Sequence, residues 1–137
     1  EIDRQSLGGK IDKNSLSQAF SKLFMKSPTL AKFYNSVPDA DKEKYRKTVS
    51  FIADFDESLD AIMKVMKHDA FYIWTIGNRF VGGREIPNSE ILIDLMENRG
   101  VPLFFDAERR IMNKTQPRRN KSSQTMEKER ILIFHRN

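Results

Sequence analysis

The residues best suited to chemistry in this chain form one basic segment, Asn113 to Lys121, with the sequence NKTQPRRNK. It contains four positive charges and no acidic residue. Lysine and arginine displace counterions from phosphates, so the segment is suited to a nucleic acid, although a solvated surface loop would have the same composition. The residues expected to contact nucleic acid are Lys114, Arg118, Arg119, Asn120 and Lys121. The four cations would meet phosphates, which position a duplex without reading its sequence, and the asparagine would reach a base edge or brace the loop.

A second candidate follows the apolar run Ala70–Ile76 (AFYIWTI). Its aromatic and β-branched residues without polar alternation predict a strand covered on both faces, as in a parallel sheet, with its aromatic residues in the core. Ligands of open α/β sheets bind beyond the carboxyl ends of such strands, so we expect Gly77 and Asn78 to line a cleft and Arg79 to contact nucleic acid beside it. An ordinary turn role for Asn78, bonding its own backbone, stays open.

Other kinds of active site find no support in the sequence. The chain has no cysteine, which excludes disulfides, thiolate zinc sites and a cysteine nucleophile within it. It contains no P-loop, HExxH or GxSxG motif. The two histidines, His68 and His135, are far apart and favour solvated or capping roles over metal ligation. We therefore expect no catalytic residue and no metal site in this chain, and the sequence assigns no residue to a cofactor.

Helices are expected to dominate the first half of the chain. Apolar residues at helical spacing predict a short helix over Ser15–Phe24 and a second helix that begins at Ser27-Pro28. A long amphipathic helix is expected from about Asp41 to Lys67, capped by Asp39 or Asp41. The carboxylates near its middle, Asp56 among them, are interpreted as part of a solvated helix face.

The second half predicts a strand–helix–strand–strand series. After the strand that ends at Gly77, Gly82-Gly83 marks a loop, and a helix is expected from Pro87 to about Asn98 with Gly100 as its stop. Strands are expected over Val101–Ile111 and Arg130–His135. This order is typical of an α/β fold. If the last strand is antiparallel, the basic segment lies at the same edge as Gly77.

Size and charge set broad limits. A chain of 137 residues is within the range of one domain. The net charge of +5 fits an acidic partner, although acidic residues are spread throughout. The longest apolar run is too short to cross a bilayer, and no secretory signal is visible, so we expect a cytoplasmic protein without membrane contact. The chain opens on Glu1 instead of Met, as expected of a piece of something longer.

Residues 49–137 resemble the carboxyl half of the site-specific DNA amino-methyltransferases, of the N4-cytosine or N6-adenine kind. The shared features are a strand that ends in Gly-Asn, an Ile-Pro before the next helix, and an Asn-Lys-x-x-Pro-x-x-Asn segment formed by Asn113, Lys114, Pro117 and Asn120. The resemblance implies half of a class I, Rossmann-like methyltransferase sheet (helix-strand-helix-strand-strand) preceded by a short helical region. Residues 1–40 would form the helical, variable region and residues 41–137 the partial α/β methyltransferase domain.

The resemblance also implies a function. It predicts methylation of an exocyclic amino group in duplex DNA with S-adenosylmethionine as donor, as in restriction-modification systems. The family's cofactor loop and Asp/Ser-Pro-Pro-Tyr motif are absent from this chain, so cofactor binding is expected only in a complete enzyme. We therefore expect association with a missing amino-terminal half, a second subunit or a second copy. Two alternatives stay open: a non-catalytic DNA-binding or assembly module derived from that fold, and a methyltransferase acting on RNA or protein.

Overall fold

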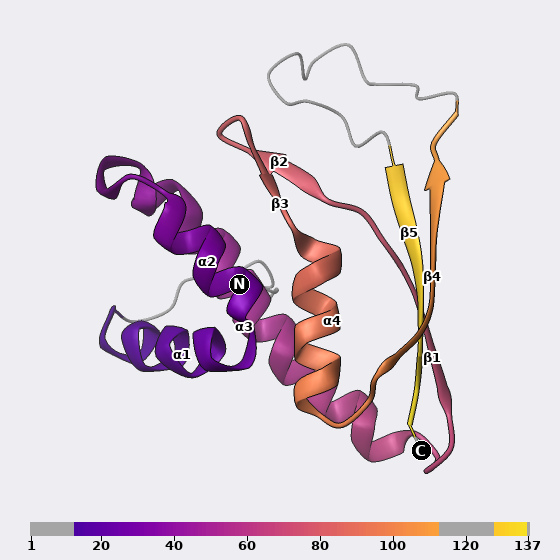
Figure 1. The fold of residues 1–137 in the computed structure, drawn as a ribbon. Helices are drawn as coiled ribbons and strands as arrows, with labels where there is room; N and C mark the ends of the chain where they lie inside the picture. Colours follow the sequence, from indigo (N-terminus) through magenta and orange to yellow (C-terminus); the bar gives the residue numbers. More distant parts are fainter. Residues whose placement is uncertain (1–12, 113–127, 137) are drawn as a thin grey trace, which may run out of the picture. The chain divides into compact units, whose positions relative to one another are not determined.

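The computed structural model describes residues 13–112 and 128–136 (Figure 1). The chain divides into two compact units, Glu1–Lys67 and His68–Asn137. These units are defined by contacts within the chain and do not test the boundary between the helical region and the methyltransferase domain. The domain division expected at residue 40 therefore stays a prediction. Among the described residues, no helix combines the length and the apolar character needed to cross a membrane.

The first unit is helical, as predicted. The second helix begins where the sequence indicated, because Ser27 Oγ accepts a hydrogen bond from Leu30 N (3.2 Å) and Pro28 occupies the first turn. Asp41, one of the two predicted caps, is the N-cap residue of the long helix, but its side chain makes no cap hydrogen bond and accepts from Lys44 Nζ at 2.8 Å. The elements are α1 (Lys13–Lys26), α2 (Pro28–Ser36), a 3-10 turn (Asp39–Asp41) and α3 (Lys42–Val65).

One face of α3 is buried and includes an acidic residue. Val49 and Ile52 are almost fully buried, and Asp56, one helical turn after Ile52, is 7% exposed. Lys26, the last residue of α1, donates to Asp56 Oδ2 at 2.6 Å. The prediction that Asp56 lies on a solvated face is therefore wrong. Helical spacing places it on the buried stripe, where the ammonium group of Lys26 compensates its charge.

The second unit contains the predicted strand–helix–strand–strand series and one additional hairpin. Gly82 and Gly83 have φ angles of 56° and 79°, as a two-residue type I′ turn requires, and they join two short strands. The sequence predicted the loop but not the strands that flank it. The elements are β1 (Phe71–Ile76), β2 (Arg79–Val81), β3 (Arg84–Ile86), α4 (Asn88–Asn98), β4 (Leu103–Arg110) and β5 (Lys128–His135).

The three long strands form an antiparallel sheet in the order β1-β5-β4. Among the described strands no two neighbours are parallel, contrary to expectation, although β1 and β4 run in the same direction with β5 between them. The register pairs Ile76 with Arg130 and Arg110 with Lys128. The ends of β1 and β4 and the start of β5 consequently meet at one edge, here called the Gly77 edge. The last strand is antiparallel to both neighbours, which is the condition under which the basic segment was expected at the same edge as Gly77.

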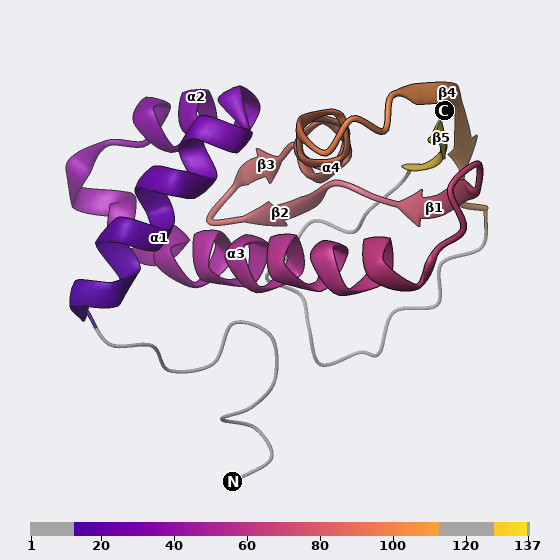
Figure 2. The ribbon, with the colours of Figure 1, turned by 90° about the horizontal axis from the view of Figure 1, so that it is seen from below.

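Helix α4 covers one face of this sheet (Figure 2). It ends at Asn98 with Gly100 as its stop, as predicted, and the φ of 74° at Gly100 allows Val101 N to donate back to Met96 O. Strand β1 is buried on one face only: Tyr72 is 4% exposed, whereas Phe71 and Ile73 are 51% and 67% exposed. The prediction of burial on both faces is wrong, as is the core role for Phe71. The reason is that, in this unit, a helix lies on only one side of the described sheet.

Candidate functional site

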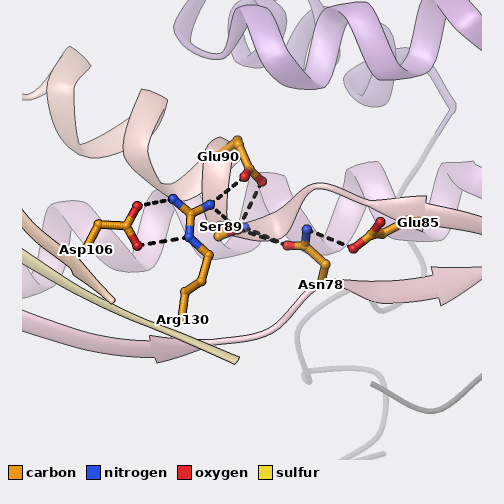
Figure 3. Close-up of polar contacts among 6 residues, drawn as sticks. All are labelled: Asn78, Glu85, Ser89, Glu90, Asp106 and Arg130. Carbon is orange, nitrogen blue, oxygen red and sulfur yellow. Dashed lines mark hydrogen bonds and ion pairs between the residues drawn. The ribbon is translucent and has the colours of Figure 1, made fainter. Parts of the chain in front are cut away.

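A cluster of polar side chains lies at the Gly77 edge, with Arg130 at its centre (Figure 3). Arg130 Nε donates to Asp106 Oδ1 at 3.0 Å, and Nη2 donates to the second oxygen of the same carboxylate. Its Nη1 donates to Ser89 Oγ (2.9 Å) and to Glu90. This one guanidinium thus joins β4, β5 and the first turn of α4. Bidentate pairing of this kind fixes geometry as well as charge.

Asn78 connects the same cluster to the end of β1. Its Oδ1 accepts from Ser89 N (3.1 Å) and lies 3.0 Å from Ser89 Oγ, while its Nδ2 donates to Glu85 at 3.2 Å. Asn88 Nδ2 donates to Gly77 O at 3.2 Å. Helix α4 has no side-chain cap from the residue before it, so Asn78 supplies the missing acceptor from another element.

Arg130 and Asp106 stabilise each other's charged forms. The hydrogen bond from Arg130 lowers the pKa of Asp106 below its ordinary value. The same hydrogen bond to Asp106 raises the pKa of Arg130. Both shifts favour the charged forms, so these two groups are fixed ions at neutral pH and are poorly suited to proton transfer. The arrangement holds backbone segments in position.

Ion pairs also lie where β4 and β5 flank the basic segment. Arg109 pairs with Glu129, and Lys128 Nζ lies 2.9 Å from Glu108 Oε1. Each of these cations faces an acid on the neighbouring strand. The segment itself lies outside the described residues, together with Lys114, Arg118, Arg119, Asn120 and Lys121.

The three other predicted site residues are described. Gly77 and Asn78 are half-buried at the Gly77 edge, and Arg79 is exposed as the first residue of β2. The side-chain bonds of Asn78 run to Glu85 and Ser89 instead of to its own backbone, so it differs from a simple turn residue. The roles of Gly77 and Asn78 in a cleft and of Arg79 in binding nucleic acid stay predictions.

Sequence reasoning missed the centre of the cluster. Arg130 was assigned only to the start of a strand, and neither Asp106 nor Ser89 was singled out. One signal was present: Arg130 is two residues before Leu132 and four before Phe134, so it shares their buried strand face. A charge on a buried face requires partners. The alternation of side chains along the strand therefore indicates that Arg130 is paired, but its partners come from distant parts of the chain.

The described residues offer no clear cofactor or metal centre. Gly82 and Gly83 form the tip of a hairpin, so they are not the strand-to-helix turn that brings a backbone close to a nucleotide cofactor. Within residues 13–112 and 128–136, no three His, Asp or Glu side chains are grouped as metal ligands. Among the described residues, this glycine pair therefore does not fit the backbone turn that would hold S-adenosylmethionine.

The chain is similar to the Type II methyltransferase M.MvaI of Kocuria varians, with 29% identity over 141 residues. The match covers 98% of this chain but 31% of that protein, so the chain spans about a third of its relative's length. No family model matches the chain, and no solved structure matches it. The similarity supports a relationship to methyltransferases, and the mixed helix and sheet architecture fits it. The match also reaches beyond residues 49–137 into the helical first unit.

Proposed function

We propose that this chain is the carboxyl-terminal part of an S-adenosylmethionine-dependent DNA methyltransferase that modifies an exocyclic amino group of cytosine or adenine. The observation that carries the proposal is the similarity over 98% of the chain to a type II methyltransferase. The order of elements around the basic segment agrees with the resemblance that the sequence motifs indicated. A role in a restriction-modification system follows from the same similarity.

In this proposal the chain holds the DNA backbone. An enzyme that modifies a base must extrude it from the duplex, so the flanking backbone has to be held in place. The cations of the segment 113–121 contact phosphates, with Arg79 beside them at the Gly77 edge. The cluster around Arg130 holds the strand ends from which these residues project. S-adenosylmethionine supplies the methyl group when it is bound in the complete enzyme.

Methyl transfer tests the activity directly. The complete gene product, or this chain mixed with its partner polypeptide, is incubated with tritiated S-adenosylmethionine and duplex DNA. We expect label in the DNA and, after nucleoside digestion, N4-methylcytosine or N6-methyladenine. The proposal fails if no duplex DNA from a broad set of sequences becomes labelled.

A matched pair of variants tests the proposed phosphate contacts. The first replaces Arg118, Arg119 and Lys121 with Gln, and the control replaces the exposed Lys47, Lys64 and Lys67 of α3 and its end with Gln. Both lose three positive charges. Each lost phosphate contact lowers the magnitude of the slope of log affinity against log salt by about 0.9. We expect a reduction of about 3 for the first variant and little change for the control; equal reductions would contradict the assignment.

The absent cofactor loop and catalytic motif favour one further candidate, a non-catalytic DNA-binding or assembly module. Such a module would shift duplex DNA in electrophoresis while no combination with candidate partners transferred a methyl group. Competition between duplex DNA and structured RNA distinguishes both from an enzyme that acts on RNA, because the preferred polymer would displace the other.

A further inference from the structure

The sheet face opposite α4 is exposed and apolar. It is here called the outer face and comprises Phe71 and Ile73 of β1 and Phe104 and Phe105 of β4. These four side chains are 51%, 67%, 68% and 50% exposed, in that order. The rings of Phe71 and Phe104 lie 5.7 Å apart in an edge-to-face arrangement, so the aromatic residues of the two strands form one surface.

The outer face is large for an exposed apolar surface. A buried aromatic side chain covers about 150–250 Å², so four large side chains at half exposure or more present an area on the order of 400 Å². Soluble monomers have a largest apolar patch of about 300–600 Å², and patches of that size are often functional. His135 stacks on Phe71 within this face at 4.2 Å between ring centroids, and the ion pair of Arg109 and Glu129 lies farther along the same face. The four large side chains themselves carry no charge, so the complement of this part of the face must be apolar.

A free strand edge lies next to this surface. Among the described strands, β1 pairs with β5 alone. Arg136 N donates to Ala70 O, so the antiparallel alternation directs the N–H groups of Phe71, Ile73 and Thr75 away from β5. The strand sequence FYIWTI contains no charge and no proline, the two residue classes that usually protect an edge from pairing.

We propose that the free strand edge of β1 and the outer face form one interface, which accepts a strand–helix segment from the remaining part of a methyltransferase. The strand would pair with β1, and the apolar face of the helix would cover Ile73 and the two phenylalanines of β4. The inference rests on the proposed function, and it specifies where the rest of the enzyme attaches. The same polypeptide or a separate subunit can supply the segment.

The exposed surface and the free strand edge together select this occupant. A strand alone would pair with β1 but would leave Phe104 and Phe105 exposed on the same face, because they lie on β4, beyond β5. A second copy paired edge to edge would place both outer faces in water as one larger apolar surface. A strand followed by a helix covers both neighbouring features at once, which is how α/β sheets bury their faces. The relative is also long enough to supply such a segment, because this chain matches only 31% of its length.

The probe for the test is the Kocuria varians methyltransferase expressed without the region that matches this chain. We would measure its association with the 137-residue chain by analytical ultracentrifugation, and methyl transfer in a separate assay. The face variant is Ile73→Lys, and the control is Val65→Lys at the end of α3, since Val65 is 81% exposed and lies in the first unit. We expect association at micromolar concentration, weakened at least tenfold by Ile73→Lys and unchanged by Val65→Lys.

Hydrogen exchange gives a second measurement in the same mixture. On association, the amides of Phe71, Ile73 and Thr75 should become protected, whereas those of Tyr72 and Trp74, directed at β5, should change little. Absence of association, or association with unchanged exchange at these three amides, would overturn the interface. Association without methyl transfer would support the interface and count against the proposed function. If methyl transfer occurred and Ile73→Lys left it unchanged, the result would support the proposed function and count against the interface.

Discussion

The polar cluster at the Gly77 edge predicts a specific loss of stability when Arg130 is replaced by Met. The substitution keeps most of the side-chain volume but removes the donors to Asp106, Glu90 and Ser89. It also leaves two carboxylates near one another without their shared cation. Hydrogen bonds to charged groups contribute about 1.5–3 kcal/mol when they are buried. The pairs here are partly exposed, with side-chain exposures of 22% for Arg130 and 34% for Asp106, so screening reduces that value.

We therefore expect Arg130→Met to lower the free energy of unfolding of the second unit by about 2 kcal/mol. Arg130→Lys should lose about half as much, since lysine keeps the charge but cannot form the bidentate pair. The matched control is Arg110→Met on β4, an exposed position where a change within about 0.5 kcal/mol is expected. A double-mutant cycle with Asp106→Asn should give a coupling of about 1 kcal/mol.

Urea unfolding followed by tryptophan fluorescence provides the assay, because Trp74 is the single tryptophan and lies in β1, opposite Leu132 of β5. It reports on the unit that contains the cluster. The midpoint should shift while the slope of the transition is unchanged. If Arg130→Met and Arg110→Met were equally stable, the cluster would not hold the Gly77 edge together, and the positioning role given to it would be wrong.

Three further predictions follow from the second unit. Arg130 lowers the pKa of Asp106 from the ordinary 3.8, so the ionised carboxylate stabilises the fold above that pH. This stabilisation is lost as the pH falls through the lower pKa of the folded state. In an acid titration, the free energy of unfolding should therefore decrease less below about pH 4 in Asp106→Asn than in the wild type. Asn78→Ala should destabilise by about 1–2 kcal/mol in urea unfolding and speed amide exchange at Ser89, which a mere surface residue would not do. Gly100→Ala should cost about 1 kcal/mol from its φ of 74° alone, since no atom lies within 4 Å of an added Cβ; a thermal midpoint equal to wild type would contradict this.

The sequence alone determined the features that depend on near neighbours along the chain. The start of α2 at Ser27-Pro28, the end of α4 at Gly100 and the three long strands lie close to where the local pattern indicated. Each depends on interactions within a few residues: a cap, a positive φ, or a run of β-branched and aromatic side chains. The methyltransferase resemblance came from a combination of such local features, namely the strand that ends in Gly-Asn, the Ile-Pro before the next helix and the Asn-Lys-x-x-Pro-x-x-Asn segment. The similarity to a type II methyltransferase supports it.

The tertiary structure decided what depends on pairing between distant segments. An apolar run such as β1 has the same sequence whether one or both of its faces are covered, so only the placement of α4 showed that Phe71 and Ile73 are exposed. The insertion of β5 between β1 and β4 likewise depends on long-range hydrogen bonds that no local pattern encodes. The partners of Arg130 are 24 to 41 residues away in sequence. Local sequence could show that this charge needed compensation, but only the fold could bring Asp106 and Ser89 to it.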